Sequence, residues 1–380
     1  MPRIKFGIFP CTEDWPDGKE MVRVYEEIVA EAKVAEQVGF DSCMITEHHQ
    51  QPDGYFPNPL MVATGIARET TTLKVGTCVA LAPLYHPVRL AEDTALLDVI
   101  SNGRLQLGVG AGYVDADLDA FDVDMSQRGV LFDDAVQFLK RAWTETDVSF
   151  KGQHHNFEKV NVTPKPVQKP RPQIWCAAWT PQGLRRAGRI GDRWITDVIN
   201  TLPTFNLFAD IYRKSAQEHG QTPAITVLRE CWVAPTRQQA MEEYGEYVMT
   251  SHRFYYEVGG YNEVVDPWIK DLKSPDEFTL ERVAPNRFIM GSPDDCIEQI
   301  EKWNRDLGTD YFVMRFRHPN GPEHKKVLDA IKLFGETGFN DWIATCKGLQ
   351  TLGDLVDEVR RAGIETFKER SRSCGAEAVL

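Results

Sequence analysis

The stretch IKFGIF at residues 4–9 is a short run of β-branched and aromatic side chains of the kind that forms a strand. Residues 21–38 follow, with apolar side chains at every third or fourth position, as on one face of an amphipathic helix. Gly39 then stands where a helix commonly ends, and a second strand-like run begins at Cys43. This order predicts two parallel strands joined by a helix.

The same alternation continues along the chain and predicts eight strands, each followed by a helix. The further strands are expected at residues 43–46, 73–80, 105–109, 174–177, 194–196, 225–233 and 311–316. The later helices are expected to begin near Pro59, Pro87, Arg128, Pro181, Thr204, Thr236, Pro293 and Pro322. Proline is favoured at a first helical position because the N–H group that it lacks would be unpaired there. Eight parallel strands favour an α/β fold of the closed (β/α)8 type, a TIM barrel.

Three segments do not follow this repeat. Residues 147–172, after the fourth helix, contain two short alternating runs and a proline-rich stretch, which predicts a surface hairpin and linker. Residues 251–287, before the eighth strand, are rich in aromatic side chains, and so long an insertion could form a lid or simply pack on the barrel rim. Residues 338–380 predict a C-terminal helical tail beyond a barrel domain at 1–337.

The composition excludes several classes of protein. The chain has 380 residues, 42% of them hydrophobic, and a formal net charge of −13, so a disordered chain and a nucleic-acid partner are both disfavoured. No stretch approaches the roughly 20 apolar residues that span a bilayer, and no secretory signal is visible at the N-terminus. Eight isolated cysteines without a CxxC pair are typical of reduced thiols, so a cytoplasmic location is expected.

Candidate functional residues follow the predicted strands. In such a barrel the loops after the strands meet at one face, where function collects. The polar and aromatic residues in these loops are those at 46–49, 83–87, 110–113, 115, 117, 179–183, 197 and 318. We therefore expect them to converge on one rim.

Glu47, His48 and His49 follow the second strand. Adjacent side chains at a strand end point to opposite sides, so only one of the two histidines can face the barrel mouth. That histidine could transfer protons near neutral pH, or both could be tied into loop hydrogen bonds. A metal site is a poorer interpretation because neighbours cannot share one ligand face, and no metal is predicted.

Two further motifs suggest a ligand with a phosphate and a flat part. Thr180 and Pro181 look like the cap and first residue of a helix, whose exposed N–H groups can bind phosphate, although an ordinary capped helix would look the same. Residues 108–112, GVGAG, lack the spaced last glycine of a dinucleotide fingerprint, so that interpretation is rejected. Glycines at a strand end nevertheless let a flat ligand approach the backbone.

Four passages together resemble the bacterial luciferase-like flavin-dependent monooxygenases, the family that includes alkanal monooxygenase. They are EHH at 47–49 with NP at 58–59, VGT at 75–77 with HP at 86–87, AED at 91–93 with SNGRL at 101–105, and WTP at 179–181 with GDRW at 191–194. The resemblance covers roughly residues 2–335.

The resemblance implies reduced FMN, or a reduced deazaflavin, bound at the C-terminal ends of the strands. His48 would be catalytic beside the flavin, and Asp117 would orient or tune the site. A non-proline cis peptide is implied near Cys78 and Val79. Further cofactor contacts are implied at Gly110, Ala111, Tyr113, Ala178, Trp179, Thr180 and Gly183.

The chain also departs from luciferase. Gly110 and Ala111 stand where luciferase has a reactive cysteine and a phosphate-binding arginine, so light emission is not implied. Phosphate would then be met by backbone amides, or by Arg185 or Arg186. Arg193 stands where the family often has glycine, so its loop is expected to serve specificity.

The implied activity is that of a two-component monooxygenase. A separate NAD(P)H:flavin reductase would supply reduced FMN, which would react with O2 to form a flavin hydroperoxide. This species would oxygenate a small apolar or carbonyl-bearing substrate by hydroxylation or Baeyer–Villiger insertion. A deazaflavin-dependent hydride-transfer enzyme and a non-catalytic flavin-binding subunit of a heterodimer are the alternatives, and the family implies a homodimer.

Overall fold

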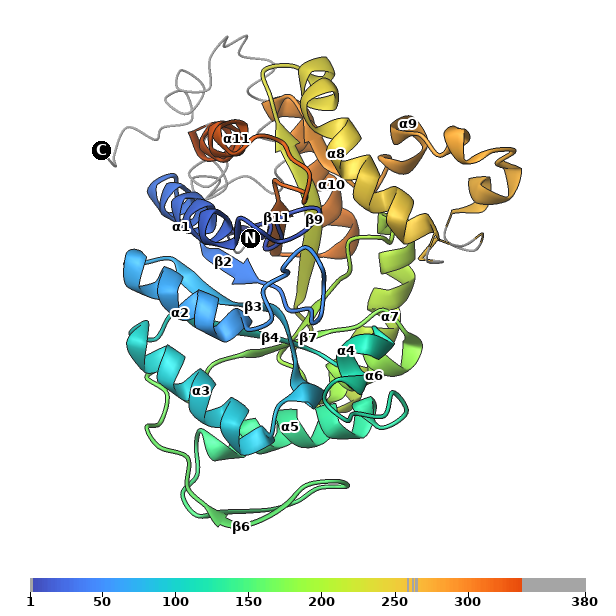
Figure 1. Ribbon diagram of the computed structural model, residues 1–380. Coiled ribbons are helices and arrows are strands. Elements are labelled where there is room, and N and C mark those ends of the chain that lie inside the picture. The colour runs from blue at the N-terminus through green and yellow to red at the C-terminus, as the bar shows by residue number, and fades with distance from the viewer. Residues whose placement is uncertain (1–2, 258–259, 262, 264–265, 337–380) are drawn as a thin grey trace, which may run out of the picture.

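The computed structural model describes residues 3–257, 260–261, 263 and 266–336. Within them, eight parallel strands close into a barrel, with β8 and β9 paired to seal it, which confirms the predicted (β/α)8 fold (Figure 1). In their order around the barrel, the strands are β1 (Lys5–Ile8), β2 (Ser42–Ile45), β3 (Lys74–Leu81), β4 (Leu105–Gly110), β7 (Ile174–Ala177), β8 (Arg193–Ile195), β9 (Ile225–Val233) and β11 (Tyr311–Arg315).

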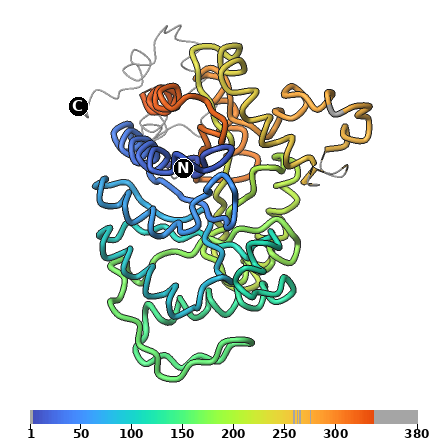
Figure 2. The backbone as a smooth tube through the Cα atoms, viewed as in Figure 1, coloured from blue at the N-terminus to red at the C-terminus, as the bar shows by residue number. Residues whose placement is uncertain are grey.

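Helices cover the outside of the barrel, as Figure 2 shows along the chain. They are α1 (Met21–Gln37), α2 (Pro59–Glu69), α3 (Pro87–Ile100), α5 (Arg128–Ala142), α6 (Pro181–Ile190), α7 (Leu202–Glu218), α8 (Arg237–Glu257), α10 (Pro293–Leu307) and α11 (His324–Glu336). Four of them begin at the expected prolines, and the Asn58 side chain caps α2 by accepting a hydrogen bond from the Met61 N–H. The last helix begins at His324, two residues beyond the expected Pro322.

Two apolar clusters lie on opposite sides of the strand backbones. The larger one fills the layer between the strands and the helices. The smaller one is drawn from the lumen-facing positions of the strands and consists of Phe9, Met44, Cys78, Trp175, Ile195, Leu228, Tyr311 and Val313. Val79, Ala177 and Val198 are half-buried against this smaller cluster, which therefore forms the floor of the barrel mouth.

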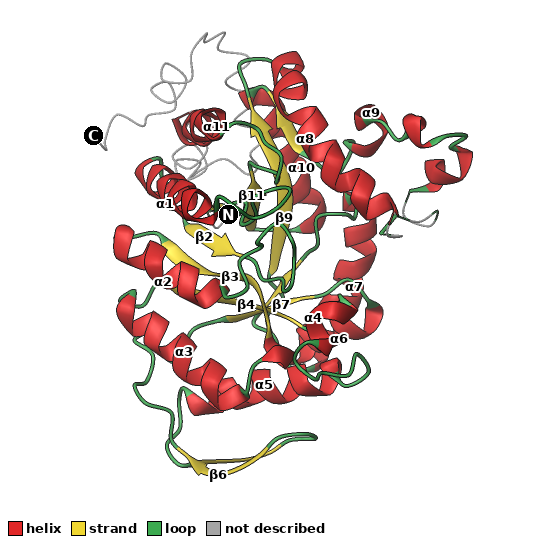
Figure 3. Cartoon of the chain, viewed as in Figure 1, coloured by secondary structure: helices red, strands yellow, loops and turns green. Residues whose placement is uncertain are grey.

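Two insertions depart from the barrel repeat (Figure 3). Strands β5 (Val148–Lys151) and β6 (Asn156–Val160) form an antiparallel hairpin beyond α5. Residues 251–257, expected to open the second insertion, are instead the final turns of α8, because the helical spacing of apolar residues continues through them. The 338–380 segment, expected to be helical, lies outside the described residues.

The rest of the second insertion consists of short elements beside α8 (Figure 3). These are η2 (Pro267–Asp271), η3 (Pro275–Glu277) and α9 (Leu280–Val283). A strand that the sequence did not predict, β10 (Ile289–Gly291), pairs with the end of β9 outside the barrel. Among the described residues, none of the helices is long and apolar enough to cross a membrane.

Candidate active site

His48 lies at the barrel mouth and is held by a buried carboxylate. Its Nδ1 atom is 2.8 Å from Oδ2 of Asp117, whose side chain is only 1% exposed. Its Nε2 atom is 3.4 Å from the hydroxyl of Tyr113, and its ring meets those of Tyr55 and Tyr113 edge-on. Because Nδ1 donates to Asp117, Nε2 is the atom that can exchange a proton with a group in the mouth.

His49 points away from His48, as the alternation of side chains predicts. Its Nε2 atom is 2.9 Å from Oε1 of Glu47, and its ring packs edge-on against Phe121. Its backbone N–H donates to Oδ1 of Asp117 at 3.1 Å. Asp117 therefore fixes both histidines, one through its ring and one through its backbone.

The ends of β3 and β4 pack closely against each other at the mouth. The Cys78–Val79 peptide is cis, as the resemblance implies. A Cβ atom placed on Gly110 would lie 2.6 Å from Cγ2 of Val79, so glycine lets the Val79 side chain pack against the end of β4. Gly112, with φ of +80°, turns the chain toward the helix that carries Asp117.

Tyr113 and Trp179 extend the site from two different loops. Their ring centroids are 5.1 Å apart in an edge-on arrangement, and 52% of Tyr113 and 40% of Trp179 are exposed. Burial raises the pKa of the Tyr113 phenol, so its hydroxyl stays protonated. Ala111 and Ala178, the alanines predicted to contact the cofactor, do not face the lumen. Both pack against the larger apolar cluster, between the strands and the helices.

The start of α6 offers fewer phosphate donors than the sequence suggests. Thr180 caps the helix by accepting the Gly183 N–H at 3.1 Å, and Pro181 has no N–H to donate. Arg186, a candidate phosphate partner, instead donates to Oδ1 of Asp133 at 2.8 Å, while Arg185 is exposed on α6.

The expectation that Arg193 serves specificity is wrong. Arg193 is the first residue of β8, at the end of the barrel opposite to the mouth. Its guanidinium donates to Asp310 at 2.6 Å and lies 5.3 Å from the centre of the Trp175 ring. The side chain therefore closes the bottom of the lumen.

Two charged residues that the sequence analysis overlooked complete the mouth. Arg315 ends β11, and its Nη2 atom is 3.4 Å from Oε1 of Glu13, in the loop after β1. Although burial opposes the charge on Arg315, nearby acidic groups, including Glu230 and Glu13, raise its pKa further. Arg315 ends its strand and Glu13 lies in the loop after β1, so reading the C-terminal ends of the first and eighth strands and their loops for charge would have found them.

His318, expected at the rim, is instead completely buried under α8. Its Nδ1 atom accepts from the Ser251 hydroxyl at 2.8 Å, and its Nε2 atom is 2.9 Å from the Tyr244 hydroxyl. Burial first, and then the charge of Arg315, hold its pKa well below the ordinary value. His318 therefore fastens α8 to the barrel through its hydrogen bonds to Ser251 and Tyr244.

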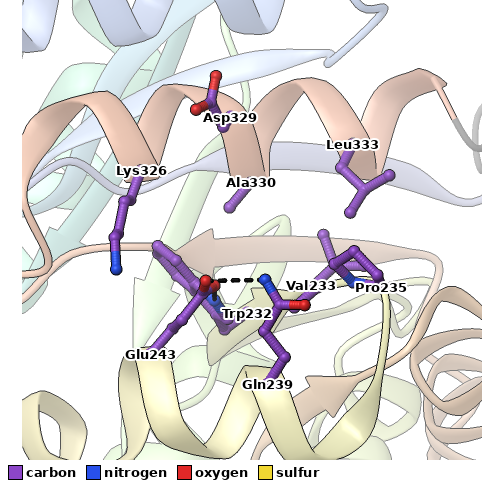
Figure 4. A pocket seen from close by; sticks show the side chains of 10 residues that line it. Trp232, Val233, Pro235, Gln239, Glu243, Lys326, Asp329, Ala330 and Leu333 are labelled. Carbon is purple, nitrogen blue, oxygen red and sulfur yellow. Dashed lines mark hydrogen bonds between the residues drawn. The ribbon is translucent and has the colours of Figure 1, made fainter.

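A separate cavity of about 180 Å³ lies between α8 and α11, beside the end of β9 (Figure 4). The Glu243 carboxylate accepts from the Gln239 amide and the Trp232 indole along one wall. This cavity contains none of the expected site residues. Within the described residues, no group of three or more His, Cys, Asp or Glu could hold a metal ion.

A sequence model of the family described as "Luciferase-like monooxygenase" matches residues 4–311. The chain therefore belongs to the luciferase-like monooxygenase family and is an oxidoreductase of that family.

Several known proteins align with most of this chain. The oxygenase component of the flavin-dependent trigonelline monooxygenase of Acinetobacter baylyi is 27% identical, over 97% of this chain and 98% of its own length. The alkanal monooxygenase alpha chain of the Kryptophanaron alfredi symbiont is 31% identical over 87% and 96%. The crystal structure of the monooxygenase RslO1 from Streptomyces bottropensis superposes with a TM-score of 0.75 at 26% identity, over 88% and 98%.

A relative with a different cofactor also matches. The F420-dependent glucose-6-phosphate dehydrogenase of Nakamurella multipartita is 27% identical over 88% of this chain and 95% of its own length.

The alignment with the trigonelline enzyme covers 97% of this chain, so it extends into residues 338–380, beyond the range of the resemblance described above.

Proposed function

We propose that this chain is the oxygenase component of a two-component monooxygenase that uses reduced FMN and O2. The observation that carries the proposal is the pairing of His48 with buried Asp117 beside the glycine-lined end of β4. The name of the trigonelline relative, an oxygenase component of a flavin-dependent enzyme, supports the two-component arrangement.

The residues of the mouth suit a flat, phosphate-bearing cofactor. Gly110 and half-buried Val79 would lie against the ring system, because no side chain projects from the end of β4. The phosphate would lie toward the start of α6, where Thr180 is exposed. Bound in its reduced form, FMN would supply the electrons that activate O2.

The protein residues would then control protons and water. His48 would hold or release a proton at Nε2, while Asp117 keeps its ring in one orientation. Tyr113 and Trp179 would cover the cofactor from the open side and limit the entry of water. The substrate would be a small apolar or carbonyl-bearing molecule, and either hydroxylation or Baeyer–Villiger insertion is compatible with these groups.

The test is turnover with an NAD(P)H:flavin reductase as the partner. We expect the purified chain to convert at least one member of a panel of cyclic ketones and aromatic compounds, with less release of hydrogen peroxide than reductase alone. The His48→Ala variant should lose at least 100-fold in product formation while still binding FMN. If wild type and variant formed the same amount of product for each reduced FMN consumed, the role of His48 would be refuted.

A second candidate is a deazaflavin-dependent hydride transfer, favoured by the match to the F420-dependent dehydrogenase. Anaerobic titration with reduced FMN and with reduced F420 separates the two proposals, because only the second enzyme would bind F420 and ignore O2.

We also expect a homodimer. A chain that gains activity only with a second, related subunit would instead be half of a heterodimer. Sedimentation and turnover of the chain alone test this point.

A further inference from the structure

Glu47 is a buried carboxylate on which three hydrogen-bond donors converge. Its Oε2 atom accepts from the Leu81 N–H at 2.7 Å. Its Oε1 atom accepts from the Tyr85 hydroxyl at 3.0 Å and faces Nε2 of His49 at 2.9 Å. The residue is only 2% exposed, so these three donors replace the water that the charge has lost.

This arrangement requires a carboxylate and not an amide. Leu81 approaches one oxygen of Glu47, while Tyr85 and His49 approach the other. Glutamine would place an NH2 group against at least one of these donors, because it has a single acceptor oxygen. Burial, followed by the charge of Glu47, raises the pKa of Tyr85, which keeps its hydroxyl protonated and able to donate.

The three donors belong to segments that build the candidate site. Leu81 ends β3 and pairs with Gly110 of β4, just beyond the irregularity between Thr77 and Ala80. His49 is the neighbour of His48. Glu47 therefore joins the strand end that would face the cofactor to the turn that carries the proton-exchanging histidine.

The peptide between His48 and His49 is held from two sides. Asp117 accepts from the His48 ring at 2.8 Å and from the His49 N–H at 3.1 Å, while Glu47 holds the His49 ring. Besides Asp117, the titratable groups that face the His48 ring are the phenols of Tyr55 and Tyr113. Glu47 thus reaches His48 only through its neighbour.

We propose that Glu47 is a positioning residue that fixes the direction in which Nε2 of His48 points into the barrel mouth. This inference rests on the proposed role of His48 in proton transfer. It assigns no contact with substrate or cofactor to Glu47 itself. Loss of the carboxylate would let the His49 ring and the end of β3 move, and the His48 ring would turn with them.

The first test compares Glu47→Gln with Glu31→Gln, in which another buried glutamate, on α1 and away from the mouth, is replaced. The readouts are the imidazole 15N resonances of His48, assigned with His48→Asn, and the pH profile of kcat/KM. We expect Glu47→Gln to change the 15N resonances, move the profile by at least half a pH unit and lower kcat about tenfold, with KM for reduced FMN within threefold. Glu31→Gln should leave these readouts at their wild-type values.

Two variants of His49 decide the matter if Glu47→Gln does not fold. His49→Leu removes the donor to Glu47, whereas the amide of His49→Gln can still donate to it. We expect the leucine variant to change the His48 resonances and the glutamine variant to stay close to wild type. Wild-type resonances in both variants, or in a folded Glu47→Gln protein, would overturn the inference. Because these spectra need no flavin, absence of oxygenation in the wild type would contradict the proposed function separately.

Discussion

Asp117 reaches His48 across 69 positions of sequence, with Oδ2 of the carboxylate 2.8 Å from Nδ1 of the imidazole. The contact joins the loop after β2 to α4 (Asp115–Asp119), the short helix after β4. It leaves Nε2 as the ring atom nearest the open mouth. The chemistry proposed for this protein depends on that orientation.

Replacing Asp117 by asparagine should lower kcat about 10- to 100-fold, because the amide has one acceptor for two donors and leaves the histidine misoriented. Binding of reduced FMN should change little, since Asp117 is only 1% exposed. Asp115→Asn, at an exposed position of the same helix, is the matched control for steady-state kinetics. Equal kcat values for the two variants would contradict the assigned role of Asp117.

A methyl group at Gly110 should displace the Val79 side chain, which packs against the end of β4. The added Cβ atom would lie 2.6 Å from Cγ2 of Val79, so Gly110→Ala should cost about 1–3 kcal/mol of stability and weaken FMN binding. Val79→Ala removes Cγ2, the atom that the added Cβ would contact. The double variant should therefore regain stability and FMN affinity in urea unfolding and fluorescence titration; a purely additive loss would show that the two sites are independent.

Asp266 and Arg287 form a buried ion pair that fastens the insertion after α8, with Nη2 of Arg287 2.8 Å from both carboxylate oxygens and side chains at most 3% exposed. Asp266→Asn should cost about 3–5 kcal/mol, because it leaves a buried guanidinium without its anionic partner. Urea unfolding and limited proteolysis measure this loss, with exposed Asp276→Asn as the control. Joint replacement by Asp266→Leu and Arg287→Met should recover most of the stability, and failure to recover would argue against a charge effect.

Glu31 should make the protein less stable as the pH rises. Burial, only partly offset by Arg317, raises the pKa of this carboxyl from 4.5 to about 8 in the folded state. Between these values the unfolded chain has lost the proton that the folded chain retains, so the free energy of unfolding falls from pH 4.5 to about pH 8. Glu31→Gln should match wild type near pH 4.5 and exceed it by about 1–3 kcal/mol at pH 8. Urea unfolding at pH 5 and 8 checks this, and a difference that does not grow with pH would contradict it.

The barrel could be predicted from local sequence because its signals are local. Pro59, Pro87, Pro181 and Pro293 mark helix starts through their own backbone chemistry, and the strands between them are apolar runs. β10 escaped prediction because three residues give no periodicity, and its pairing partner at the end of β9 lies far away in sequence. The end of α8 was missed because its aromatic side chains obscured a helical spacing.

The site was predictable only in part. His48 could be placed at the mouth because it follows a strand directly, and alternation assigned His49 to the other side. The pairing of Arg315 with Glu13 depends on a tertiary contact that no local pattern encodes, because the two residues lie 302 positions apart in sequence. Spacing alone could not anticipate that Ala178 faces the outer core.

The separation of the lumen cluster from the outer core has a consequence for protein engineering. Val79, Ala177 and Val198 border the mouth while leaving the layer beneath the helices untouched. A directed-evolution library restricted to these three positions would vary the shape offered to new compounds while leaving the packing between the strands and the helices unchanged. Activity toward new substrates and thermal stability could therefore be selected in separate steps, at different positions of the chain.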